Sequence, residues 1–215
     1  MENGTATLCM RHLVSAGWLL LLEINPSIYW ATVSTDEYHK SMAKLIADLI
    51  DMLAEIHRPG VLHGDIHPYN VGWLLQHGGS GSSPIFFDFG RAYYNGHGPS
   101  AFSGLPAEND YTPTRMLAHG PDDQPAYTAR DDLESLAYTA LAFLKLSHNP
   151  WAMKDERDSP TRAEVIEQRE WALGHWEQAK GRLLHRVDEV ALEFTKYAKA
   201  LEPGAEIAYR EGLFA

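Results

Sequence analysis

The chain has 215 residues, of which 45% are hydrophobic and 11% aromatic, and this composition supports a packed core rather than a disordered chain. Its 18 Lys and Arg residues are outnumbered by 29 Asp and Glu residues, and the resulting net charge of −11 argues against nucleic acid or an anionic membrane surface as the main partner. The one cysteine, Cys9, excludes an intramolecular disulfide and a cysteine-based zinc cluster.

The longest apolar run, Trp18–Leu22, ends at Glu23 and is much shorter than the roughly 20 apolar residues of a membrane span. It also lacks the length and the cleavage pattern of a signal peptide. We therefore expect an intracellular protein, located in the cytoplasm, with neither a membrane nor nucleic acid among its partners.

In chain order, the first clear pattern is the continuous apolar run Trp18–Ile24, which is typical of a buried strand. A helix is predicted from Ser34, whose hydroxyl stands three residues before Glu37 in a capping-box pattern. Apolar residues then recur at helical spacing, and Pro59 and Gly60 are expected to end this helix.

Two short strands are predicted at residues 71–75 and 85–88, joined by a Gly- and Ser-rich hairpin loop at residues 77–84. From Gly90 to about Ala129 the sequence shows no regular periodicity and is rich in Gly and Pro. Long irregular segments in compact domains are often binding or active-site loops, so we expect this segment to contribute to a site.

The last third of the chain is predicted to be helical. Apolar residues at helical spacing mark a central helix at residues 133–144 and another at residues 190–201, which Pro203 and Gly204 would close. Pro160 is expected in the first turn of a further helix. These elements together predict an α+β fold that is mainly α and contains a small β-hairpin region.

The densest group of polar residues is the segment 61–70, which contains Asp65 and Asn70 between a predicted helix and a predicted hairpin. Asp88 follows 18 residues after Asn70 and begins the tripeptide Asp-Phe-Gly. A loop bearing Asp and Asn, a short hairpin and then Asp-Phe-Gly match the magnesium and phosphoryl-transfer half of a kinase signature. Mg²⁺ prefers hard oxygen ligands shared with substrate phosphates, and a separate carboxylate is needed for the attacking hydroxyl.

On these residues, the chain resembles the C-terminal lobe of a protein-kinase-like fold, in particular the casein kinase I group. A third block, Arg130–Tyr138, is similar to the stretch that opens helix F in that group. Pro150-Trp151 and residues 207–214 are similar to later segments of the group. The resemblance therefore extends from about Trp18 to the end of the chain.

The resemblance implies a single C-lobe domain over residues 1–215, with a remnant strand and hinge at residues 1–30 and a helical lobe at residues 31–215. The Gly-rich loop, the Val-Ala-Ile-Lys strand and the helix with the partner Glu have no counterpart in the sequence. We therefore expect a truncated N-lobe, and with it the loss of the parts that clamp the α- and β-phosphates.

For the chemistry, the resemblance implies that Asp65 is the catalytic base and that Asn70 and Asp88 hold Mg²⁺. ATP is the implied phosphate donor. The phosphate acceptor would be a hydroxyl on a protein or on a small molecule.

For the support of the site, the resemblance implies that Asp132 is the buried helix-F aspartate that braces the catalytic loop. His63 is expected to be a packed histidine that also braces this loop. The hinge, whose backbone would meet the adenine, is implied to comprise Glu23, Ile24 and Asn25.

The sequence departs from the protein-kinase pattern at three places. Gly64 replaces the catalytic-loop Arg that commonly pairs with a phosphorylated activation loop, so activation of that type is not expected. His67 stands where protein kinases have a Lys, and the pattern His-Gly-Asp-x-His-Pro-x-Asn resembles aminoglycoside- and choline-kinase-like small-molecule phosphotransferases. The usual Ala-Pro-Glu is absent, and residues 114–117 take roughly its place.

Three functions remain open at this point. The first is an ATP-dependent phosphotransferase that uses Asp65, Asn70 and Asp88. The second is a pseudokinase that acts as a binding or regulatory module, as a homo-oligomer or with a partner protein, through the exposed surface that an N-lobe would cover. The third is a repurposed enzyme that acts on a small molecule through Asp65 and His67 without nucleotide.

For several residues the sequence favours ordinary structural roles. His67 is expected either to contact phosphate or to face solvent. Asp131 and Glu134 are interpreted as charges at a helix start, which the helix dipole favours. The charges of residues 155–186 are expected to form a solvated helix face. Trp171 and Trp176, with Trp151 nearby, are expected to take part in core or helix packing.

Overall fold

The computed structural model describes residues 19–20, 35–75, 82–94, 111–119, 123, 125–144, 161–176, 178 and 186–209. In this part of the chain the predicted fold class is confirmed, because helices dominate and the strands form a small antiparallel region. In chain order, the elements are β1 (Leu19–Leu20), α3 (Thr35–His57), β2 (Val61–Leu62), η1 (Pro68–Asn70), β3 (Val71–Leu75), β4 (Ser82–Phe86), η2 (Phe89–Arg91), β5 (Tyr93–Tyr94), α4 (Thr114–Ala118), α5 (Ala129–Leu144), α6 (Arg162–Gly174) and α8 (Arg186–Ala200).

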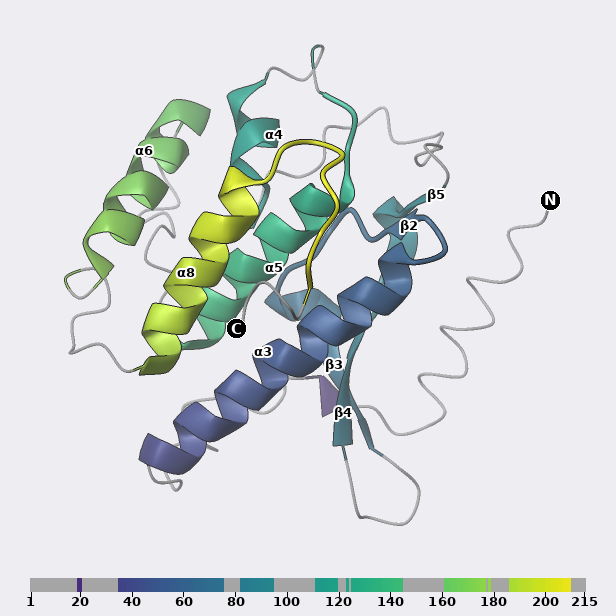
Figure 1. Ribbon diagram of the computed structural model, residues 1–215, viewed down its shortest axis with the longest axis vertical. Coiled ribbons are helices and arrows are strands. Elements are labelled where there is room, and N and C mark those ends of the chain that lie inside the picture. The colour runs from purple at the N-terminus through teal and green to yellow at the C-terminus, as the bar shows by residue number, and fades with distance from the viewer. Residues whose placement is uncertain are drawn as a thin grey trace.

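Helix α5 is the centre of the core and packs against both α8 and α3 (Figure 1). All its residues from Asp131 to Leu141 are buried. A helix that is covered on all sides must be apolar or must pair each of its polar groups. Helix α5 has many buried apolar side chains, and its buried carboxylates are hydrogen-bonded, as described below. The predicted central helix is therefore confirmed, with a start four residues earlier than its apolar pattern.

Helix α3 covers one side of α5 with an amphipathic face. Its buried stripe follows the three- and four-residue spacing of one helix face, and its first turn carries Asp36 and Glu37, which suit the helix dipole. The helix ends as predicted, since Gly60 adopts φ 82° and its N–H donates to the His57 carbonyl at 2.8 Å. Ser34, the predicted cap, lies outside the described residues.

The hairpin β3–β4 differs from its predicted bounds at one strand. β3 has the predicted bounds, but β4 begins at Ser82 and ends at Phe86, so residues 82–84 belong to the strand and not to the loop. Pro84 is tolerated there because β4 lies at the edge of the sheet β1-β3-β4, where a missing N–H interrupts no ladder. The strand stops before Asp88, whose left-handed backbone (φ 59°) cannot continue it.

The C-terminal helices follow their predicted patterns, but both starts are shifted, and α8 begins at Arg186 rather than at residue 190. Helix α6 begins at Arg162 because Thr161 is its N-cap, in a reciprocal capping box with Glu164. The start predicted at Pro160 is therefore wrong by two residues. Helix α8 ends at Ala200, ahead of Gly204 with φ 83°. Within the described ranges, no helix has the length and hydropathy to cross a membrane.

Candidate active site

Two strand pairings bring the polar loop and the Asp-Phe-Gly segment face to face. The loop at residues 63–70 lies between β2 and β3, and the segment at residues 87–92 lies between β4 and β5. Because β2 pairs with β5 and β3 pairs with β4, both ends of one segment are fixed to both ends of the other. Segments 18 residues apart in sequence are therefore held as two facing walls of one site.

Hydrogen bonds at Phe87 join the two walls. The Phe87 N–H donates to the Asn70 carbonyl at 3.1 Å, and the Phe87 carbonyl lies 3.1 Å from His63 Nε2. The next residue, Asp88, is exposed, and its Oδ1 accepts from the Gly90 N–H at 3.2 Å. The backbone on the N-terminal side of Asp88 is thus fixed directly to the loop that carries Asn70.

His63 is fully buried at the junction of the two walls. Its ring packs against Phe86 and Phe89, with centroid distances of 5.6 and 4.6 Å. Burial lowers the pKa of His63, although the nearby carboxylates oppose this shift. A neutral, packed imidazole bound to a backbone carbonyl suits a residue that braces the loop.

Asn70 is held against the loop by its side-chain amide. Its Nδ2 donates to the Asp65 carbonyl at 2.9 Å and lies 3.0 Å from His67 Nε2. This arrangement leaves the amide oxygen as the atom that Asn70 can offer to a cation. An amide oxygen and a carboxylate oxygen are both donors of the kind that Mg²⁺ prefers, so the prediction that Asn70 and Asp88 hold Mg²⁺ stays a prediction.

The Asp65 carboxylate faces two positively ionisable side chains. Its Oδ2 lies 3.7 Å from His67 Nε2 and 3.8 Å from Arg91 Nε. Burial alone would raise the pKa of Asp65, but His67, Arg91 and His63 outweigh this effect and hold the pKa below its ordinary value. Asp65 is therefore ionised at neutral pH and can accept a hydrogen bond from a hydroxyl group.

Asp132, in the first turn of α5, binds the start of the loop at residues 63–70. Its carboxylate accepts from the N–H groups of His63 (2.6 Å) and Gly64 (2.9 Å) and from the Tyr127 hydroxyl (2.9 Å), and it lies 2.9 Å from His57 Nε2. Burial would raise the pKa of this fully buried carboxyl group, but His57, His63 and the Gly64 N–H hold it below its ordinary value.

Gly64 explains one departure from the protein-kinase pattern. It adopts φ +78°, and a Cβ atom there would lie 2.3 Å from the Arg91 carbonyl oxygen. A side chain is therefore excluded both by backbone conformation and by contact with the opposite wall. The catalytic-loop Arg could not occupy this position unless the segment around Arg91 moved.

His57 connects Asp132 to the C-terminal segment and was not identified from the sequence. Its Nδ1 contacts the Tyr209 hydroxyl, and the two ring centroids are 5.8 Å apart. Residues 201–209 return from the end of α8 toward α3 (Figure 1), and the Ala208 N–H donates to the Tyr197 hydroxyl at 3.2 Å. The contact at His57 therefore ties the last described segment to the support of the loop.

Tyr209→Phe is expected to lower the free energy of unfolding by about 1 kcal/mol, because it removes one hydrogen bond between partly buried groups and keeps the ring. Urea denaturation would measure this loss. Tyr94→Phe is the matched control, since the Tyr94 side chain is exposed, and it should change stability by less than about 0.5 kcal/mol. Equal stability of both variants would contradict a tether at His57.

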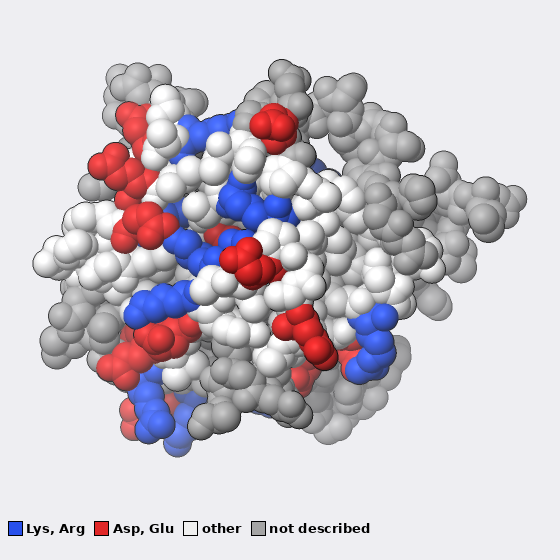
Figure 2. Space-filling model, turned by 45° about the horizontal axis from the view of Figure 1, so that its top comes forward, with Lys and Arg blue, Asp and Glu red and all other residues white. Residues whose placement is uncertain are grey.

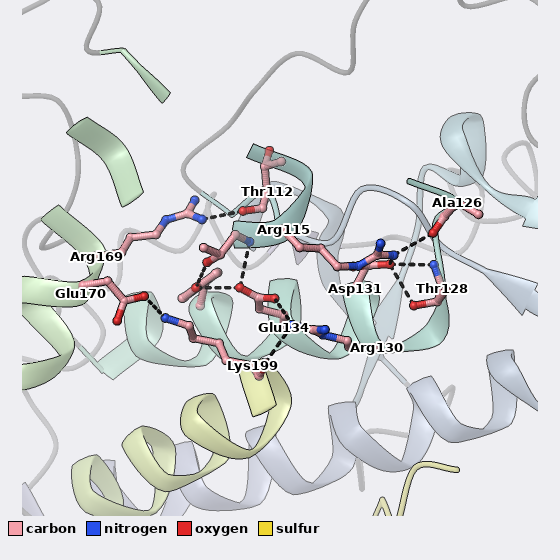
Figure 3. Close-up of polar contacts among 12 residues, drawn as sticks. Thr112, Arg115, Ala126, Thr128, Arg130, Asp131, Glu134, Arg169, Glu170 and Lys199 are labelled. Carbon is pink, nitrogen blue, oxygen red and sulfur yellow. Dashed lines mark hydrogen bonds and ion pairs between the residues drawn. The ribbon is translucent and has the colours of Figure 1, made fainter. Parts of the chain in front are cut away.

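A buried polar network anchors the segment around α4 to α5 and α6 (Figure 3). Arg115 Nε donates to Asp131 Oδ1 at 2.7 Å, and Glu134 Oε1 accepts from the Thr114 N–H at 2.8 Å. From α6, Arg169 Nη1 donates to the Thr112 carbonyl at 2.5 Å. This network includes Thr114 and Arg115, which belong to the residues 114–117 that stand roughly where protein kinases have Ala-Pro-Glu.

The structure revises several sequence interpretations. Asp131 lies in the first turn of α5, as interpreted, but Glu134 lies beyond it. Both carboxylates are fully buried and bind the α4 segment, which the helix dipole alone does not explain. Arg169 was expected on a solvated face but is fully buried, with its guanidinium 4.4 Å from the centre of the Tyr138 ring. Trp176 is buried as expected, whereas Trp171 is 49% exposed and stacks on His175, with ring centroids 5.2 Å apart.

The surface over this network is not uniformly acidic. Figure 2 brings the top of Figure 1 forward, and Lys and Arg side chains gather near the middle of this face, with Asp and Glu side chains beside them. Lys199 pairs with Glu170, whose side chain is 56% exposed. The net charge of −11 therefore coexists with a face of mixed sign.

A small cavity of about 40 Å³ lies beside Asp65 and extends toward α5. This volume holds a few water molecules and is too small for a nucleotide. Tyr93 and Tyr127 form part of its wall, with stacked rings whose centroids are 5.2 Å apart.

The described residues contain no group of three or more His, Cys, Asp or Glu side chains that could hold a metal ion by themselves. The predicted hinge residues Glu23, Ile24 and Asn25 lie outside the described residues.

Comparison with known proteins supports a kinase-like relationship. No family model matches the chain. The chain is similar to Casein kinase 1-like protein HD16 of Oryza sativa subsp. japonica, with 31% identity over 145 residues, or 62% of this chain and 20% of the relative. The chain thus spans about a fifth of the length of this relative. The similarity agrees with the predicted resemblance at the level of a kinase-like protein.

Proposed function

We propose that this chain carries the catalytic loop of an ATP-dependent phosphotransferase that acts on a hydroxyl acceptor, on a protein or on a small molecule. The observation that carries the proposal is the joining of the two walls at Phe87. Its N–H binds the Asn70 carbonyl, the Asn70 amide binds the Asp65 carbonyl, and Asp88 follows Phe87 directly. These contacts support the proposal, because phosphoryl transfer depends on oxygen groups held in fixed positions.

In the proposed reaction, the Asp65 carboxylate orients the acceptor hydroxyl and takes its proton. The hydroxyl oxygen forms a bond to the γ-phosphorus of ATP, and the bond from that phosphorus to the β,γ-bridging oxygen breaks. ADP leaves with the electron pair of the broken bond. Asn70 and Asp88 would hold Mg²⁺, which offsets the charge of the ATP phosphates when it is bound.

Calorimetric titration with ATP, with and without Mg²⁺, tests the proposal on the wild type and on Asp88→Asn. The wild type is expected to bind ATP only with Mg²⁺, and Asp88→Asn is expected to lose this binding because an amide replaces the charged metal ligand. Asp123→Asn is the matched control, since the Asp123 side chain is 96% exposed and belongs to neither wall, and it should bind as the wild type does.

The opposite result would redirect the search for a function. Absence of binding at millimolar ATP would contradict a nucleotide-dependent activity. It would favour the binding module or the nucleotide-independent enzyme, and these two differ in a simple observation. A binding module would self-associate or hold a stable partner, whereas a nucleotide-independent enzyme would turn over a small molecule in the presence of EDTA.

A further inference from the structure

Arg91 forms an ion pair with Asp65 but no hydrogen bond to it. The Nε of Arg91 is 3.8 Å from Asp65 Oδ2, which exceeds hydrogen-bond distance. The guanidinium forms no hydrogen bond to any other side chain among the described residues. The side chains of Arg91, Asp65 and His67 are 25%, 18% and 17% exposed, so a dissolved ligand can reach all three.

Arg91 also differs from His67 in the permanence of its charge. A guanidinium stays protonated at every physiological pH, whereas imidazoles in general are only partly protonated near neutrality. His67 stands where the resemblance places a Lys, so the loop itself offers no permanent cation at this point. Arg91 is the side chain that brings one to the Asp65 carboxylate from the opposite wall.

The backbone of Arg91 is fixed from both sides. The turn η2 begins at Phe89, with Asp88 as its N-cap, and the Ala92 N–H donates to the Phe89 carbonyl at 3.1 Å. On its other side, Tyr93 pairs with Leu62 in the β2–β5 ladder. The Arg91 carbonyl also lies close to Gly64. A side chain at Gly64 would collide with this carbonyl, so the glycine allows the Arg91 backbone to take this position.

We propose that Arg91 contacts the transferring γ-phosphate and supplies the permanent positive charge beside Asp65. This inference rests on the proposed phosphotransferase function. Negative charge on the equatorial phosphate oxygens must be held close to the attacking hydroxyl, and a fixed guanidinium is suited to bind two of these oxygens at once. In this proposal, Arg91 supplies the permanent positive charge that His67 does not supply at the position of the protein-kinase Lys.

The test compares ATP with ADP, because only ATP carries the group that Arg91 is proposed to bind. Affinities for both nucleotides with Mg²⁺ would be measured by calorimetry for the wild type, Arg91→Met and Arg91→Lys. We expect Arg91→Met to lose about tenfold or more in ATP affinity with ADP affinity nearly unchanged, the size of a charge-assisted hydrogen bond. Arg91→Lys should retain part of the preference for ATP, since the charge remains and the two-pronged geometry is lost.

Phosphate transfer gives a second readout, with an expected loss of about 10²- to 10³-fold in Arg91→Met. Arg186→Met is the matched control, because Arg186 is exposed at the start of α8 and away from the site, and it should behave as the wild type. Thermal unfolding of each variant shows whether the fold is intact.

The outcomes separate this inference from the function on which it rests. An Arg91→Met variant that keeps the wild-type ratio of ATP to ADP affinity, in a protein that binds both nucleotides, overturns the role of Arg91 and leaves the phosphotransferase intact. A wild type that binds neither nucleotide overturns both. A selective loss of ATP affinity that Lys partly restores supports the contact.

Discussion

Asp132→Ala is expected to destabilise the protein by about 3–5 kcal/mol, the usual cost of removing one member of a buried charged network. The substitution would leave the N–H groups of His63 and Gly64 without their acceptor, along with the Tyr127 hydroxyl and the His57 ring. Each buried donor that loses its partner costs free energy, because water cannot replace the carboxylate at a fully buried position.

Urea denaturation would measure this loss, with Asp48→Ala as the control. Asp48 pairs with Lys44 on the surface, where the Lys44 side chain is 72% exposed, and such pairs contribute less than about 1 kcal/mol. A loss for Asp132→Ala no larger than that of the control would show that Asp132 does not support the loop.

The same carboxyl group makes stability depend on pH. The pKa of Asp132 is lower in the folded protein than its ordinary value of 3.8, so its contribution is complete above that value and is lost as the pH falls through the folded pKa. Asp132→Asn should therefore flatten the decline in stability below about pH 4. A decline of the same steepness in both proteins would contradict this assignment.

The helices could be predicted from the sequence because their signals are local. Helices α3, α5 and α8 each carry apolar residues at helical spacing, and a Gly or Pro follows α3 and α8. The β-hairpin prediction was wrong at Pro84, which was placed in the loop but belongs to β4. Proline disfavours a strand locally, and only the whole sheet shows that β4 lies at an edge where proline is tolerated.

The polar network could not be predicted because its partners are distant in sequence. Arg169 and Thr112 are 57 residues apart, and Arg115 and Asp131 are 16 apart. A charged residue near a helix start has an adequate local explanation in the helix dipole, and no local pattern shows that Asp131 is buried. The unusual signal was a cluster of acidic residues at the start of a strongly apolar helix, α5.

In the candidate site, too, some residues could be found from the sequence and others could not. The spacing of Asp65, Asn70 and Asp88 points to one chemistry, whereas the contact of Gly64 with Arg91 depends on strand pairings that bring residues 27 positions apart together. His57 gave no signal, because a histidine at the end of an amphipathic helix is unremarkable until its neighbours are known.

Asp65→Asn is expected to reduce phosphate transfer by about 10³-fold or more, since a positioned carboxylate that accepts the hydroxyl proton contributes 10²- to 10⁴-fold in general acid–base catalysis. The change is nearly isosteric and leaves the Asp65 backbone carbonyl, which holds Asn70, in place. Affinity for Mg²⁺ and ATP should therefore stay within a few-fold of the wild type, and the stability should change by less than about 1 kcal/mol.

This pattern differs from that of Asp88→Asn, which should lose nucleotide binding and transfer together. The comparison of the two variants separates the group that acts on the acceptor from the group that holds the metal. A wild-type rate in Asp65→Asn would show that Asp65 takes no part in the chemistry, even if Asp88→Asn confirmed the nucleotide site.

Because His67 and Arg91 both face this carboxylate, the loss of its charge should also alter the binding of anions beside residue 65. A slightly tighter binding of ATP in Asp65→Asn is therefore expected alongside the loss of turnover, and weaker binding would argue that Asp65 positions the nucleotide instead of the acceptor.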